Sequence, residues 1–162
     1  MLKYVLPLIF IVRPSTVYDL LRRRLGEIIP LNRLLGIEIA SIGDGVAEAR
    51  LPFRTELTNH IGSVHATAIF GLAEAASGGA MSGALAPVIM NVRPVAASAK
   101  VTFTKVARTE LVAHAMITGS AAELRATLAQ MGKIVFDVAV SVRDTAGADV
   151  AQVTVVWHAT NK

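Results

Sequence analysis

The chain has 162 residues, of which 53% are hydrophobic and 17% charged, so it can form a single domain with a large apolar core. It contains no cysteine, which excludes disulfides, thiolate catalysis and cysteine-based metal sites but leaves the redox compartment open. A cytoplasmic location fits this composition best. The net charge of +4 comes from residues 1–36, and no basic stripe with interleaved aromatic residues follows, so no nucleic-acid partner is expected. A surface with so little charge predicts that part of it is covered by another subunit.

The N-terminal residues divide into an arm and a helical segment. Residues 1–13 include the apolar run YVLPLIFIV, which contains a proline and is too short to span a membrane. We expect this arm to pack on the protein, with a membrane-touching or signal-like role as the alternative. Residues 14–36 predict an N-terminal helix, because Thr16 and Asp19 have the spacing of a capping box and an apolar stripe follows them. Pro30 breaks this helix.

Residues 37–160 combine short strand patterns with two helices. One helix is expected from about Ser63 or Val64 to Ala84, and a shorter one over 120–132. A linker is expected over 91–97. Six segments have the composition or alternation of strands, namely 37–42, 46–51, 98–106, 110–120, 133–144 and 150–160.

The connections between these strands favour an antiparallel sheet, because most are too short or irregular for crossovers between parallel strands. The long helix is apolar on nearly all sides, so more than one surface must enclose it. The sequence therefore predicts an α+β fold of one domain over residues 1–162, with an antiparallel sheet wrapped around a central helix.

One charged side chain interrupts the apolar stretch that contains the long helix. Between residues 61 and 92 there is no Lys, Arg or Asp, and Glu74 is the single acidic residue. Burying a carboxylate costs several kcal/mol unless it is paired or neutralised. Glu74 is therefore the first candidate for a chemical role, and the alternatives are a neutral core carboxylate or an ion pair with an arginine across a dimer interface.

The residues before Glu74 complete a recognisable pattern. The stretch NHIGSVHATAIFGLAE reads N-x2-G-x2-H-x8-E at Asn59, Gly62, His65 and Glu74. This pattern resembles that of the hot-dog thioesterases of the phenylacetate and hydroxybenzoyl-CoA type. The order of hairpin, central helix and later strands is also similar, so the resemblance covers roughly residues 30–160. It implies a hot-dog core over 37–160 with an extra N-terminal helix, in an uncharacterised branch of that superfamily.

The resemblance implies four catalytic positions. Glu74 corresponds to the carboxylate that attacks a thioester carbonyl or activates a water, and Asn59 to the residue that orients the carbonyl or the water. His65 and Ala66 lie at the start of the helix, where the main-chain N–H of Ala66 serves as oxyanion donor. The first N–H groups of a helix lack intrahelical partners and carry partial positive charge, which independently favours such a role. Purely structural roles remain as alternatives, because His65 can serve only to start the helix and Asn59 only to form a turn.

The resemblance also places four residues near the substrate: Gly62, which lets the backbone turn into the helix, Thr67, Phe70 and Ser98. Two departures from the family pattern bear on this. The usual Gly-Gly after the histidine is replaced by Ala66-Thr67, whose side chains narrow the approach of a substrate to the oxyanion donor. The position of the family's polar residue before the next strand is occupied by Ser98 or, if the alignment shifts, by Ala96.

No cofactor or metal is implied, because the four histidines form no ligand-spaced cluster with carboxylates. Ser77 and Ser82 have no nearby His/Asp arrangement and are expected to be helix-packing residues. Candidates for binding the phosphates of a coenzyme A ester are Arg54, Lys105 and Arg108.

The sequence thus predicts hydrolysis of an acyl-CoA or related acyl thioester by a homodimer or dimer of dimers. His65 and Glu74 are nine residues apart, about 13.5 Å along a helix, so one site needs two antiparallel copies of the helix. A non-catalytic thioester- or lipid-binding dimer is the alternative, and a hydratase on the same fold is a third.

Overall fold

The computed structural model describes residues 16–162, so the predicted arm over 1–13 lies outside the described residues. The described part begins with two helices, α1 (Val17–Ile28) and α2 (Pro30–Leu35). The predicted capping box is present: the hydroxyl of Thr16 accepts from the Asp19 N–H at 3.3 Å, and the Asp19 carboxylate accepts from the Thr16 N–H at 3.1 Å. Pro30 occupies the first turn of α2, where its missing N–H costs nothing.

A six-stranded antiparallel sheet follows, with the strand order β1-β2-β4-β5-β6-β3. The predicted α+β class with an antiparallel sheet is confirmed. The strands are β1 (Glu38–Ile42), β2 (Val46–Leu51), β3 (Val92–Phe103), β4 (Leu111–Ile117), β5 (Lys133–Asp144) and β6 (Asp149–Asn161). The prediction of a linker over 91–97 was wrong, because strand β3 already begins at Val92. Pro94 is tolerated there since β3 is an edge strand, which needs ladder hydrogen bonds on one side only.

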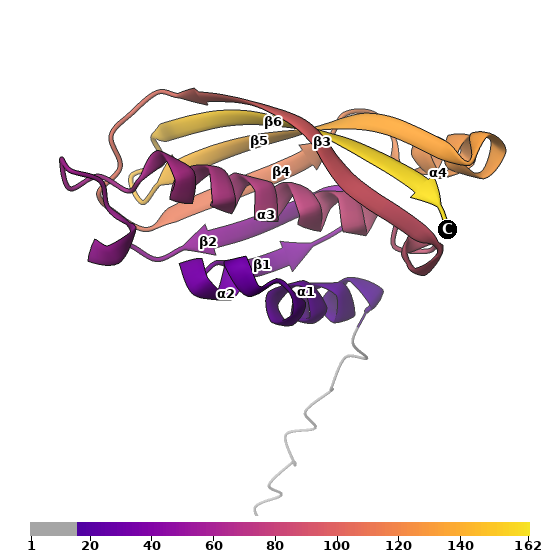
Figure 1. Ribbon diagram of the computed structural model, residues 1–162, viewed down its shortest axis with the longest axis horizontal. Coiled ribbons are helices and arrows are strands. Elements are labelled where there is room, and N and C mark those ends of the chain that lie inside the picture. The colour runs from indigo at the N-terminus through magenta and orange to yellow at the C-terminus, as the bar shows by residue number, and fades with distance from the viewer. Residues whose placement is uncertain (1–15) are drawn as a thin grey trace, which may run out of the picture.

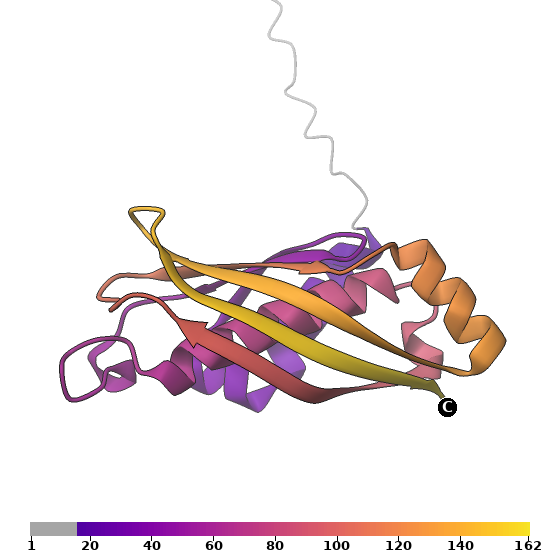
Figure 2. The same ribbon diagram turned by 90° about the horizontal axis from the view of Figure 1, so that it is seen from above.

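The sheet curls around one long helix, α3 (Ala66–Ala84), as Figure 1 shows. Figure 2, turned by 90°, shows that α3 lies against one face of the sheet along its length. Glycines allow this close packing, because a Cβ on Gly83 would lie 1.9 Å from the Gly43 carbonyl oxygen and one on Gly79 would lie 2.9 Å from Ala47. The Ala/Gly-rich composition of α3 therefore serves contact with the β1–β2 hairpin.

Helix α3 begins at Ala66, two or three residues later than expected. Val64 donates its N–H to the Ala107 carbonyl at 2.8 Å, and the Ser63 hydroxyl donates to the same carbonyl at 3.1 Å. These two residues are thus held by a distant loop and cannot join the helix. The fourth helix, α4 (Ala121–Met131), starts at a Ser120 cap and ends at Gly132. Two short 3-10 turns occur at Thr55–Leu57 and Ile89–Asn91.

None of the helices within residues 16–162 combines the length and apolar character needed to cross a membrane.

Candidate functional site

Glu74 is half-buried on α3 and has no hydrogen-bond or ion-pair partner for its carboxylate within residues 16–162. Burial raises the pKa of the Glu74 carboxyl above its usual value. A carboxylate with a raised pKa and free lone pairs can accept a proton at neutral pH. The environment of Glu74 is therefore suited to a base or a nucleophile that acts on a bound ligand.

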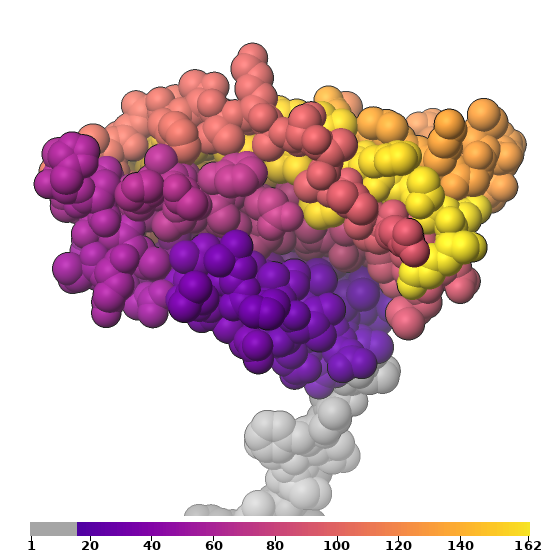
Figure 3. All heavy atoms as spheres, in the orientation of Figure 1, coloured from indigo at the N-terminus to yellow at the C-terminus, as the bar shows by residue number. Residues whose placement is uncertain are grey.

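Glu74 lies on a stripe of α3 that the described residues 16–162 leave open. Thr67 is exposed, and Phe70, Gly71, Glu74 and Gly78 are half-buried, while most other α3 residues are fully buried. In Figure 3 this part of α3 is visible between the N-terminal helices below it and β3 above it.

The walls of this open stripe come from α2 and β6. A Cβ on Gly71 would lie 2.9 Å from the Leu35 side chain, and one on Gly78 would lie 3.8 Å from the Trp157 ring. The Leu35 side chain therefore covers the α3 backbone one turn before Glu74, and the Trp157 ring lies beside it one turn after Glu74.

The loop that precedes α3 is built around Asn59. Its side-chain oxygen accepts from the N–H groups of Ile61 and Ser63, both at 3.1 Å, and its own N–H donates to the Ser63 carbonyl at 2.7 Å. Gly62 has φ +71°, a left-handed conformation that other residues adopt only under strain. Asn59 thus holds the loop with its oxygen, and its amide N–H2 has no partner among residues 16–162, so it can donate to a ligand.

The N-terminus of α3 presents one unpartnered main-chain donor. His65 is the N-cap, and its Nδ1 accepts from the Thr67 N–H at 3.1 Å. This bond requires that Nδ1 carries no proton, so the neutral ring has its proton on Nε2. Ala66 occupies the first helical position, and its N–H finds no acceptor in the described part of the chain. That N–H is available to an oxygen of a bound molecule.

Asn59 and Ala66 line a common pocket of about 330 Å³, together with Lys105. The ammonium group of Lys105 pairs with Asp144 at 2.9 Å, and Arg108 donates to the Ile61 carbonyl at 3.1 Å. The other lining residues come from the 59–66 loop, the start of α3 and the end of β3: Ile61, Ser63, Val64, Ile69, Phe103, Thr104 and Val106.

Arg54 has a different position from these two cations. Its guanidinium donates to the carbonyls of Leu34 and Leu35, at 3.0 and 2.8 Å, and so caps the end of α2. Lys105 and Arg108, not Arg54, are the basic side chains beside the predicted oxyanion donor.

The structure thus brings together five of the predicted site residues: Asn59, Gly62, His65, Ala66 and Thr67. Glu74 lies two turns further along α3, about 12 Å from Ala66 along the axis. Phe70 lies between them and packs against the core.

The side chain of Ser98 does not lie on the face of the sheet that packs against α3, the helix that carries Glu74. The register of β3 and β6 pairs Ser98 with Val156, whereas Ala96 pairs with the buried Trp157. Paired residues lie on the same face of a sheet, so Ala96 faces α3 and Ser98 faces outward. The register shift between these two residues is caused by a bulge at residue 97.

Strand β3 has an open edge and is exposed on its helix-facing side. Ala96, Ala99 and Phe103 are exposed, although they pair with the buried residues Trp157, Val155 and Ala151 of β6. A twelve-residue edge strand with unpaired N–H and C=O groups invites pairing with another chain. The open edge adjoins the open stripe of α3, so one partner can cover both.

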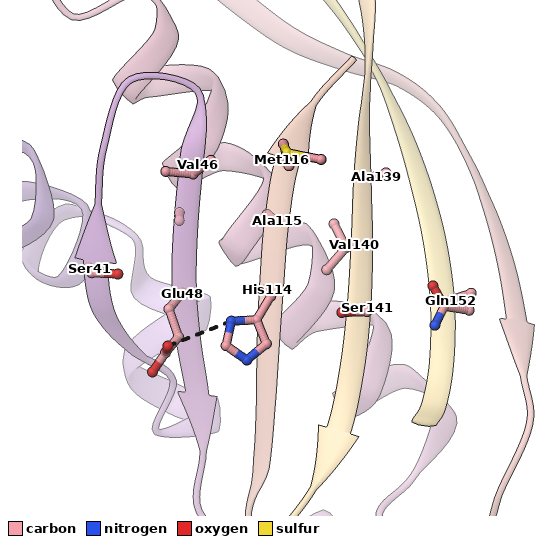
Figure 4. A pocket seen from close by; sticks show the side chains of 11 residues that line it. Ser41, Val46, Glu48, His114, Ala115, Met116, Ala139, Val140, Ser141 and Gln152 are labelled. Carbon is pink, nitrogen blue, oxygen red and sulfur yellow. Dashed lines mark ion pairs between the residues drawn. The ribbon is translucent and has the colours of Figure 1, made fainter. Parts of the chain in front are cut away.

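A second depression, of about 510 Å³, lies on the outer face of the sheet and was not predicted from the sequence. Figure 4 shows Glu48 of β2 and His114 of β4 side by side there, with their oxygen and Nδ1 3.6 Å apart. Figure 4 also shows α3 behind the sheet, so this pair has no access to Glu74.

An antiparallel sheet curled around one long helix is the hot-dog fold, and solved structures of similar fold confirm this architecture. A probable thioesterase from Pseudomonas aeruginosa, described as of unknown function, superposes with a TM-score of 0.79 at 21% identity, over 89% of this chain and 95% of its own. The PaaI protein of the E. coli phenylacetic acid degradation operon gives 0.65 at 20% identity, over 84% and 88%. A conserved Pseudomonas aeruginosa protein gives 0.70 at 25% identity, over 85% and 98%.

The chain belongs to the family of the domain of unknown function DUF4442, whose model matches residues 19–159. No curated protein sequence matches the chain.

Proposed function

We propose that the protein hydrolyses an acyl thioester, with coenzyme A esters as the substrate class, in a site that two protomers share. The observation that carries this proposal is the half-buried carboxylate of Glu74, which has no partner within residues 16–162 and lies on the open stripe of α3, beside the exposed edge of β3. The solved structures of similar fold that are named as thioesterases support the same reaction class.

The proposed dimer joins the open edges of two β3 strands and packs the open stripes of two α3 helices in antiparallel orientation. A two-fold axis then brings Glu74 of one protomer toward the loop and helix start of the other. This arrangement removes the distance of about 12 Å that separates Ala66 and Glu74 within one chain.

In the proposed reaction, the thioester carbonyl oxygen accepts hydrogen bonds from the partner's Ala66 N–H and the partner's Asn59 amide. Glu74 either attacks the carbonyl carbon or removes a proton from a water that does so. Negative charge moves onto the carbonyl oxygen, where the helix N-terminus stabilises it. The carbon–sulfur bond then breaks and the sulfur leaves as a thiolate, which takes up the proton held by Glu74 when water attacks, or a proton from solvent when Glu74 itself attacks. In the nucleophilic case, water hydrolyses the resulting anhydride, and in both cases the products are a carboxylate and a free thiol.

The ends of the substrate have distinct surroundings in this proposal. The acyl chain lies against the open stripe of α3 beside Glu74, bordered by Leu35 and Trp157. The phosphates of coenzyme A lie near Lys105 and Arg108, which border the pocket at the helix start.

The test is an assay of hydrolysis with a panel of acyl-CoA esters. The rate is measured from the appearance of the free thiol. We expect saturable turnover that falls by a factor of roughly 10²–10⁴ in Glu74→Gln, because the amide can neither attack nor accept a proton. Tight binding of an acyl-CoA without turnover in the wild-type protein would identify a thioester-binding protein instead.

A further inference from the structure

Ser77 and Trp157 form a buried polar link beneath the Glu74 turn. Ser77 lies on α3 and is 0% exposed, and Trp157 lies on β6 and is 7% exposed. The indole Nε1–H of Trp157 donates to the Ser77 hydroxyl oxygen at 3.2 Å, and that hydroxyl donates to the main-chain carbonyl of Glu74 at 2.7 Å. Two hydrogen bonds therefore connect a strand of the sheet to the backbone of the proposed catalytic residue.

This link does more than the packing role that the sequence suggested for Ser77. A tryptophan N–H and a serine hydroxyl each cost free energy when they are buried without a partner. An apolar pair of similar volume would fill the same space without that requirement. Both donors of this link, the indole N–H and the serine hydroxyl, have an acceptor only because Ser77 lies three residues after Glu74 and directly opposite Trp157.

Trp157 also touches both surfaces that the shared site requires. A Cβ added to Gly78, one turn after Glu74 on the open stripe, would lie 3.8 Å from the Trp157 ring. The backbone of Trp157 pairs with Ala96 of β3, immediately beside the bulge in that edge strand. One residue thus contacts the helix turn that carries Glu74 and the strand at which we place the second protomer.

We infer that Trp157 and Ser77 are positioning residues for Glu74, which fix the rotation of its helical turn relative to β6 and the β3 edge. The inference rests on the proposed function. It gives a physical cause for precise placement of Glu74, whose own side chain has no partner within residues 16–162. Precision matters here because a misplacement of about 1 Å can cost roughly 10²-fold in rate.

The experiment compares three full-length variants with the wild type. Trp157→Phe keeps an aromatic ring and loses the N–H, and Ser77→Ala removes both hydrogen bonds. Ser82→Ala is the matched control, because Ser82 is also buried on α3 but has no bond to Glu74. Because Trp157 is the only tryptophan of the chain, its fluorescence reports in wild type, Ser77→Ala and Ser82→Ala whether the indole has kept its partner.

Two readouts separate positioning from general stability. The first is steady-state kinetics with an acyl-CoA, for which we expect kcat to fall at least tenfold in Trp157→Phe and Ser77→Ala while KM changes less than threefold. The second is the titration of the Glu74 carboxyl followed by NMR of labelled glutamate, with Glu74→Gln to assign the signal. We expect its midpoint to move toward that of an ordinary glutamate in both variants, because a loosened turn gives the carboxylate more water.

The NMR titration does not depend on turnover, so an inactive wild type would contradict the proposed function and still leave this inference testable. A shift of the titration midpoint in both variants, with Ser82→Ala unchanged, supports positioning. Variants that lose thermal stability but keep the wild-type kcat and the wild-type titration of Glu74 would overturn it. If Ser77→Ala fails to fold, Trp157→Phe decides the question alone.

Discussion

Ala66 and Glu74 lie on the same helix but cannot reach one carbonyl group together. They are separated by eight residues, about 12 Å along the axis of α3. The free N–H of Ala66 points out of the start of the helix, whereas Glu74 lies on its open side, two turns later. Chemistry that uses both groups therefore requires a second copy of the chain.

Ala66→Pro removes the proposed oxyanion donor without a cost to the helix. Proline at the first helical position is favourable, because its missing N–H has no intrahelical partner there. The preceding residue, His65, already has φ −65° and ψ 140°, the extended conformation that a following proline demands. We expect an unchanged circular dichroism spectrum and a fall in kcat of about 10²-fold or more.

Ala66→Ser is the control for this substitution, since it changes the side chain and keeps the N–H. It should retain activity within a few-fold of wild type. Equal loss in both variants would mean that the side chain at this position, not its N–H, governs turnover.

Glu74→Gln should make the folded protein more stable at neutral pH. Burial raises the pKa of the Glu74 carboxyl, so the folded state holds that proton more tightly than the unfolded state. The ionised carboxylate therefore destabilises the folded state above the unfolded value of about 4.3, and the penalty disappears below it. We expect a higher Tm than wild type at pH 7 and an equal Tm near pH 4.

The exposed Glu56 provides the comparison, because Glu56→Gln should leave Tm unchanged at both values of pH. A lower Tm for Glu74→Gln at pH 7 would reveal an ion pair of Glu74 across the subunit interface, which was the alternative that the sequence left open.

Neighbouring residues of β3 offer a test of the interface. Ala99 faces α3 and Ser98 faces outward, and both are exposed in the single chain. Ala99→Arg should place a charge in the proposed interface, so we expect monomers in analytical ultracentrifugation and loss of hydrolysis. Ser98→Arg should remain a dimer with wild-type activity. Two variants with the same oligomeric state would argue against an interface on the helix-facing side of β3.

Local patterns in the sequence predicted the loop, the helix and Glu74, because each depends on residues close together in the chain. Gly62 has the left-handed conformation that the turn needs, and the acidic residue in the apolar helix proved to be half-buried with a raised pKa. The residue count between the helix start and Glu74 also sufficed to predict their separation.

Long-range contacts account for what the sequence did not reveal. The start of α3 is delayed by hydrogen bonds of Val64 and Ser63 to Ala107, which is more than forty residues away. The bulge at residue 97 exchanges the faces of β3, so Ala96 and not Ser98 turns toward α3. The link between Ser77 and Trp157 spans 80 residues and has no local signature.

Mixing two inactive variants should restore activity if the site is shared. Ala66→Pro destroys the donor half of a site, and Glu74→Gln destroys the carboxylate half. We choose Ala66 over Asn59 because the oxygen of Asn59 also holds the loop through two hydrogen bonds.

When the two variants are unfolded together and refolded in equal amounts, random pairing makes about half of the dimers mixed. Each mixed dimer has one site with both substitutions and one intact site, so roughly a quarter of wild-type activity should return. Refolding each variant alone gives the baseline. If the mixture is no more active than that baseline, Ala66 and Glu74 do not act on the same substrate across a dimer, and the shared site is refuted.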